Sequence, residues 1–365
     1  MSGLGVDVAL VAAPYGFGPL SKALAVADEL ATRGCKVAVL CHESGHALFS
    51  DRPYTAATYR WREPLNLDDL GVPLVISSGD VSTPFRRSTT RLVVLDSLLW
   101  LRGMWERPPP TDADLYVAQK FFLDPPPETA AMLGSRLRFV DAILPAWTQH
   151  VPTPVNGERE IVIYPGGLFS PVLTSEHVAA YLGWLTAVLR QVEVPQDDVV
   201  VRVPAAYLES AASAALRSVA RLRAPTPDGA ERLLHNAAQV LVAPGIESAL
   251  EAGALGFTPL FLPPLIGTHL VQLIGFRRAG FGIELTPTYT TGLADLEAST
   301  DQLNVLSKHV ADRALTMLAT LKHLDEAAEH LASFIAAEPG PRAPTFPLGR
   351  RGAEQAATLA LEVLA

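Results

Sequence analysis

Short apolar runs alternate with segments of helical periodicity along the chain. The first run, Val6–Ala12, is almost uninterrupted, which is typical of a strand that is covered on both faces. Apolar residues then recur at three- and four-residue spacing from Leu20 to Ala31, and Gly34 marks the end of that predicted helix. A second apolar run, Lys36–Cys41, follows, so this region is predicted to be a β-α-β unit.

The same alternation continues in both halves of the chain. Apolar runs predict strands at Leu74–Ser77, Leu92–Leu95, Leu115–Ala118, Phe139–Leu144, Ile161–Tyr164, Val199–Val203, Val240–Ala243 and Leu260–Leu262. Helical spacing predicts helices at Ser175–Gln191, within Pro244–Leu255, at Asp301–Ala337 and at Ala353–Ala365. A Pro, Thr, Asn and Gly stretch at 151–160 is typical of a linker, and prolines at 339–347 separate off the last helix.

Strands that alternate with helices predict an α/β fold with a parallel sheet in each half. We therefore expect two Rossmann-like domains at residues 1–152 and 158–340, and a helix at 348–365. In open parallel sheets, ligands bind beyond the carboxyl ends of the strands. Two such sheets that face each other across a cleft would hold a ligand between them.

Composition narrows the classes of function. The chain has 365 residues and a formal net charge of −9, with no run of Lys and Arg, so we expect no nucleic-acid partner. The first residues carry no basic segment, and prolines and Glu251 interrupt the apolar stretch Leu241–Ile266. With two cysteines only, a disulfide framework is excluded. We expect a cytoplasmic protein without a membrane span; the oligomeric state stays open.

A glycine-rich turn separates the first predicted strand from the first predicted helix. Gly16 and Gly18 allow a tight turn and a close approach of a ligand, and Pro19 suits the first position of a helix. The helix N-terminus favours an anion. Three interpretations stay open: an acceptor or phosphate site, a dinucleotide site, and a plain structural turn. The dinucleotide pattern is incomplete, because Ser21 stands at the third glycine position.

The stretch His42-Glu43-Ser44-Gly45-His46 has the His-Glu-x-x-His spacing of zinc hydrolases. That motif needs a helix, whereas this stretch directly follows a predicted strand and contains a glycine. We interpret it as a polar loop at the carboxyl edge, and we expect no metal site there.

The richest pattern lies between Ala243 and Gln272. Gly245 opens a predicted helix whose N–H groups suit a diphosphate. Glu251 lies one turn after Glu247, and its carboxylate suits the two hydroxyls of a ribose. A predicted loop after Pro263-Pro264 carries Thr268, His269 and Gln272, which suit sugar hydroxyls. An ordinary β-α-β unit is the alternative.

Three motifs resemble those of GT-B glycosyltransferases. They are Tyr15-Gly16-Phe17-Gly18, then Ile161 to Gly167 with its Gly-Gly turn, then Glu-Ala-x-x-x-Gly-x-x-Pro-Leu from Glu251. Asp96-Ser97-Leu98-Leu99-Trp100 and Asp114-Leu115-Tyr116-Val117-Ala118-Gln119 further resemble cytosylglucuronate synthase and related proteins of nucleoside-antibiotic biosynthesis.

The resemblance implies a GT-B fold whose last helix crosses back to the N-terminal domain. It implies an acceptor-binding N-terminal domain and a C-terminal domain that binds the nucleotide sugar. The implied donor-binding residues are Gly166, Gly167, Gly245, Ile246, Glu251, His269 and Gln272, and the implied acceptor-binding residues are Tyr15, Gly16, Phe17 and Gly18. No cofactor is implied, since the UDP-sugar is a substrate.

The sequence departs from the family at the catalytic base, because Pro19 stands where many members have His. Asp96 follows a predicted strand at its carboxyl end and is our candidate base, although an N-cap role explains it equally well. His42 is the reserve candidate, together with His46. Asp112-Ala113-Asp114 precedes a strand, so we interpret it as a solvated turn and expect metal-independent chemistry.

The sequence thus predicts a glycosyltransferase that moves a sugar, such as glucuronate, from a UDP-sugar to a small acceptor such as a pyrimidine base. Two alternatives stay open. An NAD(P)-dependent oxidoreductase would use the N-terminal glycine turn, and a non-catalytic protein would bind the nucleotide sugar without turnover.

Overall fold

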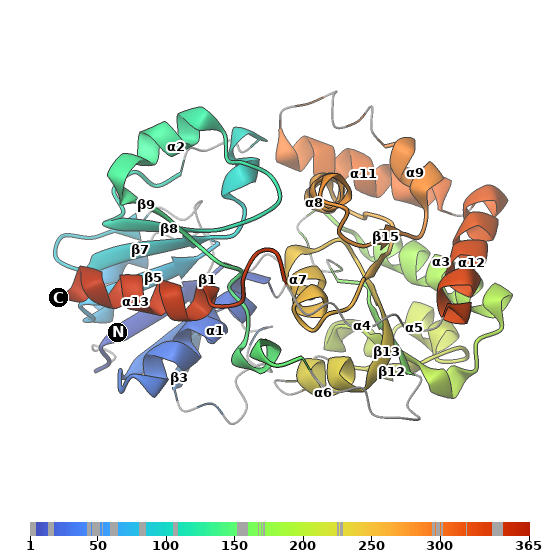
Figure 1. The fold of residues 1–365 in the computed structure, drawn as a ribbon, viewed down its shortest axis with the longest axis horizontal. Coiled ribbons are helices and arrows are strands. Elements are labelled where there is room, and N and C mark those ends of the chain that lie inside the picture. The colour runs from blue at the N-terminus through green and yellow to red at the C-terminus, as the bar shows by residue number, and fades with distance from the viewer. Residues whose placement is uncertain are drawn as a thin grey trace. The chain divides into compact units, whose positions relative to one another are not determined.

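The structure is a computed structural model with two compact units. It describes residues 5–13, 18–41, 45, 52, 54–58, 65–79, 85–104, 109–151, 160–166, 168, 170, 172–224, 226, 229–293, 296, 300, 302–318, 320–337 and 346–365. One unit, the N-terminal domain, comprises Met1–Gln149 and Pro347–Ala365, and the other, the C-terminal domain, comprises His150–Phe346. Each is built on one large parallel sheet with helices around it, as the sequence predicts (Figure 1).

The sheet of the N-terminal domain has seven parallel strands in the order β3-β2-β1-β5-β7-β8-β9. Their bounds are Val8–Ala12 (β1), Val37–Cys41 (β2), Thr55–Thr58 (β3), Leu74–Ser78 (β5), Arg91–Asp96 (β7), Leu115–Gln119 (β8) and Leu137–Val140 (β9). A small second sheet pairs β4 (Leu65–Asn66) with β6 (Phe85–Arg86). The short, partly exposed strand β3 has no clear apolar run, and sequence reasoning missed it.

Alternate residues of the central strands enter two different cores, which explains the continuous apolar runs. Val8 and Leu10 of β1 pack with α1 (Gly18–Thr32) and α13 (Gly352–Leu364) on one face. Ala9 and Val11 pack on the other face, against side chains of η2 (Leu67–Leu70), η3 (Leu99–Met104) and α2 (Pro127–Leu133). Two further 3-10 turns, η4 (Gly134–Arg136) and η5 (Ala146–Gln149), flank β9.

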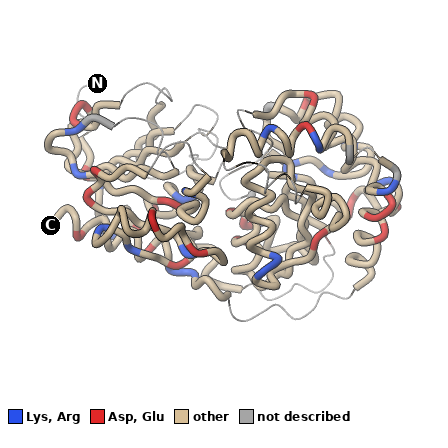
Figure 2. The backbone as a smooth tube through the Cα atoms, turned by 90° about the horizontal axis from the view of Figure 1, so that it is seen from above, with Lys and Arg blue, Asp and Glu red and all other residues tan. Residues whose placement is uncertain are grey.

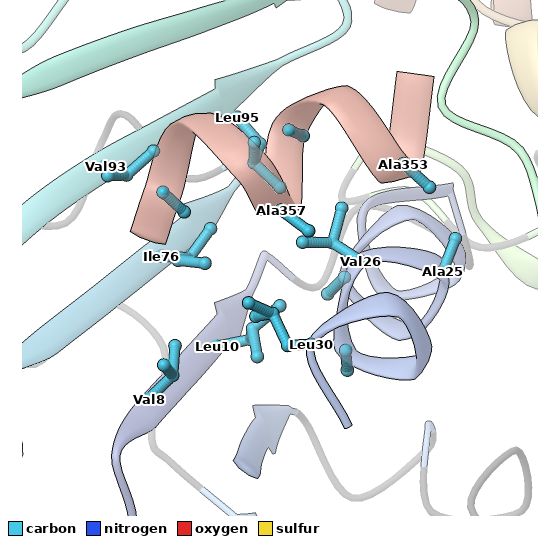
Figure 3. Packing of buried hydrophobic residues seen from close by; sticks show 14 of the residues in the cluster. Val8, Leu10, Ala25, Val26, Leu30, Ile76, Val93, Leu95, Ala353 and Ala357 are labelled. Carbon is cyan, nitrogen blue, oxygen red and sulfur yellow. The ribbon is translucent and has the colours of Figure 1, made fainter. Parts of the chain in front are cut away.

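Helix α13 completes the N-terminal domain, as the resemblance implies. Its small residues Ala356, Ala357 and Ala360 are fully buried, which allows α13 to lie close to α1 and the sheet. Figure 3 shows Ala353 and Ala357 beside Val26 on this face. At the far end of α1, the Arg33 guanidinium donates to the Thr358 hydroxyl (2.8 Å) and to the Glu354 carbonyl (3.1 Å).

The sheet of the C-terminal domain has six parallel strands in the order β12-β11-β10-β13-β14-β15. Their bounds are Glu160–Tyr164 (β10), Val199–Arg202 (β11), Arg221–Arg223 (β12), Ala237–Val242 (β13), Leu260–Phe261 (β14) and Ile283–Glu284 (β15). The helices are Ser175–Val192 (α3), Ala205–Leu208 (α4), Ala211–Leu216 (α5), Gly229–Asn236 (α6), Ile246–Ala254 (α7), Gly267–Arg278 (α8), Pro287–Thr291 (α9), Leu303–Met317 (α11) and Leu321–Ala336 (α12), with a 3-10 turn, η6, at Gln196–Asp198.

One sequence prediction in this domain is wrong and another is refined. The segment 301–337 is helical as predicted, but it is divided into α11, which ends at Met317, and α12, which begins at Leu321. The predicted loop that carries His269 and Gln272 is helix α8. Its N-terminus at Gly267 packs tightly, since a Cβ there would lie 2.8 Å from the Ser307 amide nitrogen. Glycine, a poor helix former, therefore has a packing reason here.

Among the residues that the structure describes, charged residues are dispersed over both domains and form no basic stripe, as the blue and red segments of Figure 2 show. In the described part of the chain, no helix has the length and hydropathy that a membrane crossing requires.

Candidate functional site

The carboxyl edge of the C-terminal sheet gathers most of the predicted donor-binding residues. Strands β10, β13 and β14 are parallel neighbours, so their carboxyl ends lie on one edge. Gly166 follows β10, Gly245 follows β13, and helix α8 with His269 follows β14. This edge is where ligands bind in open α/β sheets.

Two glycines line this edge. Gly166 is exposed, has φ of +24°, and a Cβ there would lie 3.4 Å from the Ala243 Cβ. Gly245 is the N-cap of α7 and brings no side-chain cap to the helix. The N–H groups of the first turn of α7, from Ile246 on, therefore have no capping side chain, which suits an anion. The same turn carries the carboxylate of Glu247, whose charge opposes one.

His269 lies beside the start of α7. A Cβ placed on Gly245 would be 3.7 Å from the His269 Nε2 atom, so the two segments predicted from separate motifs do meet. His269 is 4% exposed, and burial lowers its pKa to about 4. The imidazole is therefore neutral at pH 7 and offers one N–H donor and one acceptor.

Buried polar atoms on α8 lack protein partners. The Nδ1 atom of His269 and the Oε1 atom of Gln272 have no hydrogen-bond partner among the described residues. Both side chains are 4% exposed. A buried polar atom without a partner costs about 1–3 kcal/mol, so water or a ligand is expected to bond these two atoms.

Glu251 lies on α7 and is 7% exposed. Its charge acts on Tyr164, the last residue of β10: burial raises the pKa of this phenol most, Glu251 raises it further, and Arg202 lowers it. The carboxylate is thus close to the carboxyl end of β10. Its contact with a ribose stays a prediction.

Asp96 lies at the carboxyl end of β7 in the N-terminal domain, but its surroundings do not suit a base. The side chain is 1% exposed. One oxygen accepts two hydrogen bonds from Arg102 (2.8 and 2.6 Å) and one from the Tyr116 hydroxyl, and the other accepts from the Leu98 amide (2.7 Å). Both oxygens are thus bonded within the domain, and neither is available to take a proton from an acceptor substrate. The alternative of a structural role, with the bond to the Leu98 amide as in an N-cap, describes these contacts better.

The Asp112-Ala113-Asp114 turn is ion-paired, not simply solvated as predicted. The Asp114 carboxylate accepts hydrogen bonds from Arg87, from Arg91 (3.1 Å) and from the Leu92 amide (2.8 Å). It lies at the amino end of β8, as predicted. No group of three or more His, Cys, Asp or Glu in the described part of the chain is arranged to hold a metal ion.

On the predicted acceptor side, Gly18 is the first residue of α1, at the carboxyl edge of the N-terminal sheet. The Ser78 hydroxyl donates to the carbonyl of Pro19 (2.7 Å), which ties this helix start to β5. Other candidate site residues lie outside the described residues: Tyr15, Gly16, Phe17, His42, His46 and Gly167.

Two cations are placed differently from what the sequence pattern favours. Lys22 on α1, for which we expect a solvated helix face or a ligand contact, is 2% exposed and donates to the Gln119 side-chain carbonyl (2.6 Å). Arg202 ends β11 at the candidate site. The sequence feature that could have identified Arg202 is its position as a charged residue inside the apolar run Val199–Val203.

No family model matches the sequence, and no curated protein matches it. Among solved structures, Arabidopsis thaliana UGT89C1 complexed with quercetin has a TM-score of 0.52 at 13% identity, with 99% of this chain and 100% of that chain covered. Os79 from O. sativa, in complex with U2F and trichothecene, has a TM-score of 0.51 at 12% identity, with 98% and 100% covered. LpCGTa in complex with UDP has a TM-score of 0.50 at 14% identity, with 98% and 99% covered.

At these identities the likeness concerns the fold. It extends over nearly the whole length of each chain and includes both parallel-sheet domains. The chain therefore has the two-domain, Rossmann-like GT-B fold.

Proposed function

We propose that this protein is a glycosyltransferase that takes a sugar from a UDP-sugar. The observation that carries the proposal is the pair of buried side chains His269 and Gln272 on α8. Their Nδ1 and Oε1 atoms have no partner among the described residues, and the His269 ring lies beside the start of α7, which has no capping side chain. Buried polar groups and a helix N-terminus on one sheet edge suit a polar, anionic ligand. LpCGTa, which shares the fold, is bound to UDP.

In this proposal the donor lies along the carboxyl edge of the C-terminal sheet. Gly166 and Gly167 line its diphosphate or base, where a side chain would obstruct the approach. Gly245 and Ile246 present backbone N–H groups to phosphate. Glu251 accepts hydrogen bonds from the ribose hydroxyls, and His269 and Gln272 bind the transferred sugar.

The chemistry follows from charge. Departure of the diphosphate places negative charge on the leaving group, and the N–H groups of α7 are fixed in place before the reaction. A neutral His269 adds an N–H donor and carries no positive charge that would compete with the ribose for the Glu251 carboxylate. These groups act without a metal ion, which is the metal-independent chemistry we propose.

For the acceptor we propose a small planar molecule such as cytosine, and for the sugar glucuronate, as the resemblance to cytosylglucuronate synthase implies. The test is mass spectrometry of reactions that contain UDP-glucuronate, UDP-glucose or UDP-N-acetylglucosamine with cytosine. A product whose mass equals cytosine plus one sugar residue, formed with one donor only, supports the assignment. Absence of any transfer product under conditions where UDP binds contradicts it.

A second candidate, a protein that binds the nucleotide sugar without turnover, is favoured by the contacts of Asp96. Both of its oxygens are occupied within the domain. The other candidate base, His42, lies outside the described residues. UDP binding without a transfer product from any acceptor supports this second candidate.

The donor site is tested by Glu251→Ala and isothermal titration with UDP. Loss of two charge-assisted hydrogen bonds to the ribose should weaken UDP binding at least about tenfold. The control is Glu329→Ala, which removes a carboxylate from the exposed surface of α12 in the same domain. Equal UDP affinity in both variants, with both folded, would place the ribose elsewhere.

A further inference from the structure

Arg202 stands at the end of β11, next to the candidate site. In the sheet, β11 pairs with β10 in parallel register, with Val201 opposite Ile163. The next residues along the two strands are Arg202 and Tyr164, so they are neighbours at the carboxyl ends. Gly166 follows two residues after Tyr164 on the same edge.

The guanidinium of Arg202 packs over an aromatic ring instead of a carboxylate. Its central carbon lies 5.3 Å from the centroid of the Tyr164 ring. Its Nε atom is buried and has no hydrogen-bond partner among the described residues. A ring face attracts a cation, and the Arg202 side chain also donates a hydrogen bond to the Tyr164 hydroxyl, but neither contact supplies a negative charge.

Two other arginines of this domain, both beside the sheet, have acidic partners. Arg221, on the adjacent strand β12, pairs with Glu160, and Arg277 pairs with Glu284. Within the described part of the chain, Arg202 forms no such pair. A half-buried cation without a counter-charge is costly to keep, so this position suits an external anion.

The residues around Arg202 indicate which kind of anion could bind there. Arg202 and Glu251 both act on the Tyr164 phenol, the first lowering and the second raising its pKa, while burial raises it most. The two charged groups therefore lie near one ring. The Glu251 carboxylate can accept hydrogen bonds from hydroxyls, and the Arg202 guanidinium can donate them to a phosphate. In a nucleoside diphosphate, the ribose hydroxyls and the phosphates are adjacent.

We propose that Arg202 is an additional donor-binding residue whose guanidinium binds the diphosphate of the nucleotide sugar. The proposal rests on the proposed function, because it takes the donor to be a nucleoside diphosphate sugar. It adds a fixed positive charge to the backbone N–H groups of α7, so that the leaving group meets a side-chain cation as well as a helix N-terminus.

The test compares UDP with uridine, which lacks the phosphates, by isothermal titration. Arg202→Gln should weaken UDP binding at least about tenfold and leave uridine binding nearly unchanged. Arg202→Lys should lie between the wild type and the Gln variant, because it keeps the charge but not the planar fork. The control, Arg190→Gln, removes an exposed positive charge from α3 and should change neither affinity.

The outcomes separate this proposal from the proposed function. A wild type that binds no UDP overturns the function. A wild type that binds UDP, with Arg202→Gln binding it equally well, overturns the role of Arg202 alone. Equal weakening of UDP and uridine would show that Arg202 only supports the fold near Tyr164, and this too overturns the proposal. If the Gln variant does not fold, the Lys variant gives the same comparison.

Discussion

The two domains each bury polar side chains near the carboxyl edge of their sheet, but they satisfy them differently. In the N-terminal domain, Asp96 accepts hydrogen bonds from Arg102, Tyr116 and the Leu98 amide. In the C-terminal domain, His269 and Gln272 each keep a buried atom without a partner among the described residues. Both oxygens of the Asp96 carboxylate are bonded within the protein, whereas His269 and Gln272 keep buried atoms that a ligand can bond.

This difference shows that the hydrogen bonds of a side chain indicate its role better than its position at the end of a strand. The position of Asp96 at a strand end made it a candidate base, yet its bonds are those of a structural group. Burial raises the pKa of Tyr116, and Asp96 raises it further, so the phenol stays protonated and donates. The unsatisfied atoms of the other domain are the better guide to a ligand site.

The largest expected effect comes from breaking the completed cluster. Asp96→Ala leaves the Arg102 guanidinium buried without its carboxylate, which should lower the free energy of unfolding by about 3–5 kcal/mol. Urea unfolding at pH 7 measures it. The control, Glu209→Ala, breaks the exposed pair with Arg217 and should cost under about 1 kcal/mol.

The same substitution sharpens the functional comparison. If Asp96 were a base, Asp96→Asn would abolish turnover and leave stability intact. We expect the opposite result for Asp96→Asn. The free energy of unfolding should fall strongly, and the protein that stays folded should bind UDP as tightly as the wild type. A fully stable, inactive Asn variant would restore Asp96 as the base.

The second effect concerns pH and the incomplete cluster. His269 has a pKa of about 4 in the folded protein, below the value of about 6.5 expected in the unfolded chain. Between these values the unfolded chain binds a proton that the folded protein does not, so stability falls as pH falls. The loss should be about 1.4 kcal/mol per pH unit and reach about 3 kcal/mol near pH 4.

Carboxylates titrate in the same range, so the comparison with a variant isolates the histidine. His269→Gln should remove this part of the slope, and urea unfolding of both proteins at pH 7, 6, 5 and 4 measures the difference. Two curves that stay parallel over this range would mean that His269 is protonated as readily as in the unfolded chain.

The smallest effect comes from one bond of the completed cluster. Tyr116→Phe removes the hydroxyl that donates to Asp96 and keeps the Arg102 pair, so the cost should be about 1.5–3 kcal/mol. Thermal unfolding measures it. The control is Tyr207→Phe, whose hydroxyl makes a longer bond (3.3 Å) to the Leu168 carbonyl. A loss no greater than that of the control would mean that the carboxylate does not depend on the phenol.

The sequence predicted the elements with strong periodicity. Central strands such as β1, β5 and β10 are apolar on both faces, and a short run of that kind is typical of a buried parallel strand. Strands β12 and β15 went unpredicted, because Arg221–Arg223 and Ile283–Glu284 mix charge with apolar residues at the sheet edges. Edge strands bury less, so their sequences carry less signal.

The candidate site was predicted in part. The motif around Gly245 and Glu251 predicted a place at the carboxyl edge of the sheet, and Gly245 does follow the carboxyl end of β13. The bonding at that edge could not be predicted. Helix α8 gives little helical amphipathicity in sequence because most of it is buried, and the partners of Asp96 and Lys22 come from strands far away in the chain.

Helix α13 has a consequence for how the protein is made. The N-terminal domain needs Ala353, Ala356, Ala357 and Ala360 to cover one face of its sheet, and these residues leave the ribosome only after the entire C-terminal domain. The C-terminal domain is one continuous segment and has all its residues earlier. The domain that is synthesised first therefore completes its core last. The face of its sheet that α13 covers stays exposed until translation of the last helix.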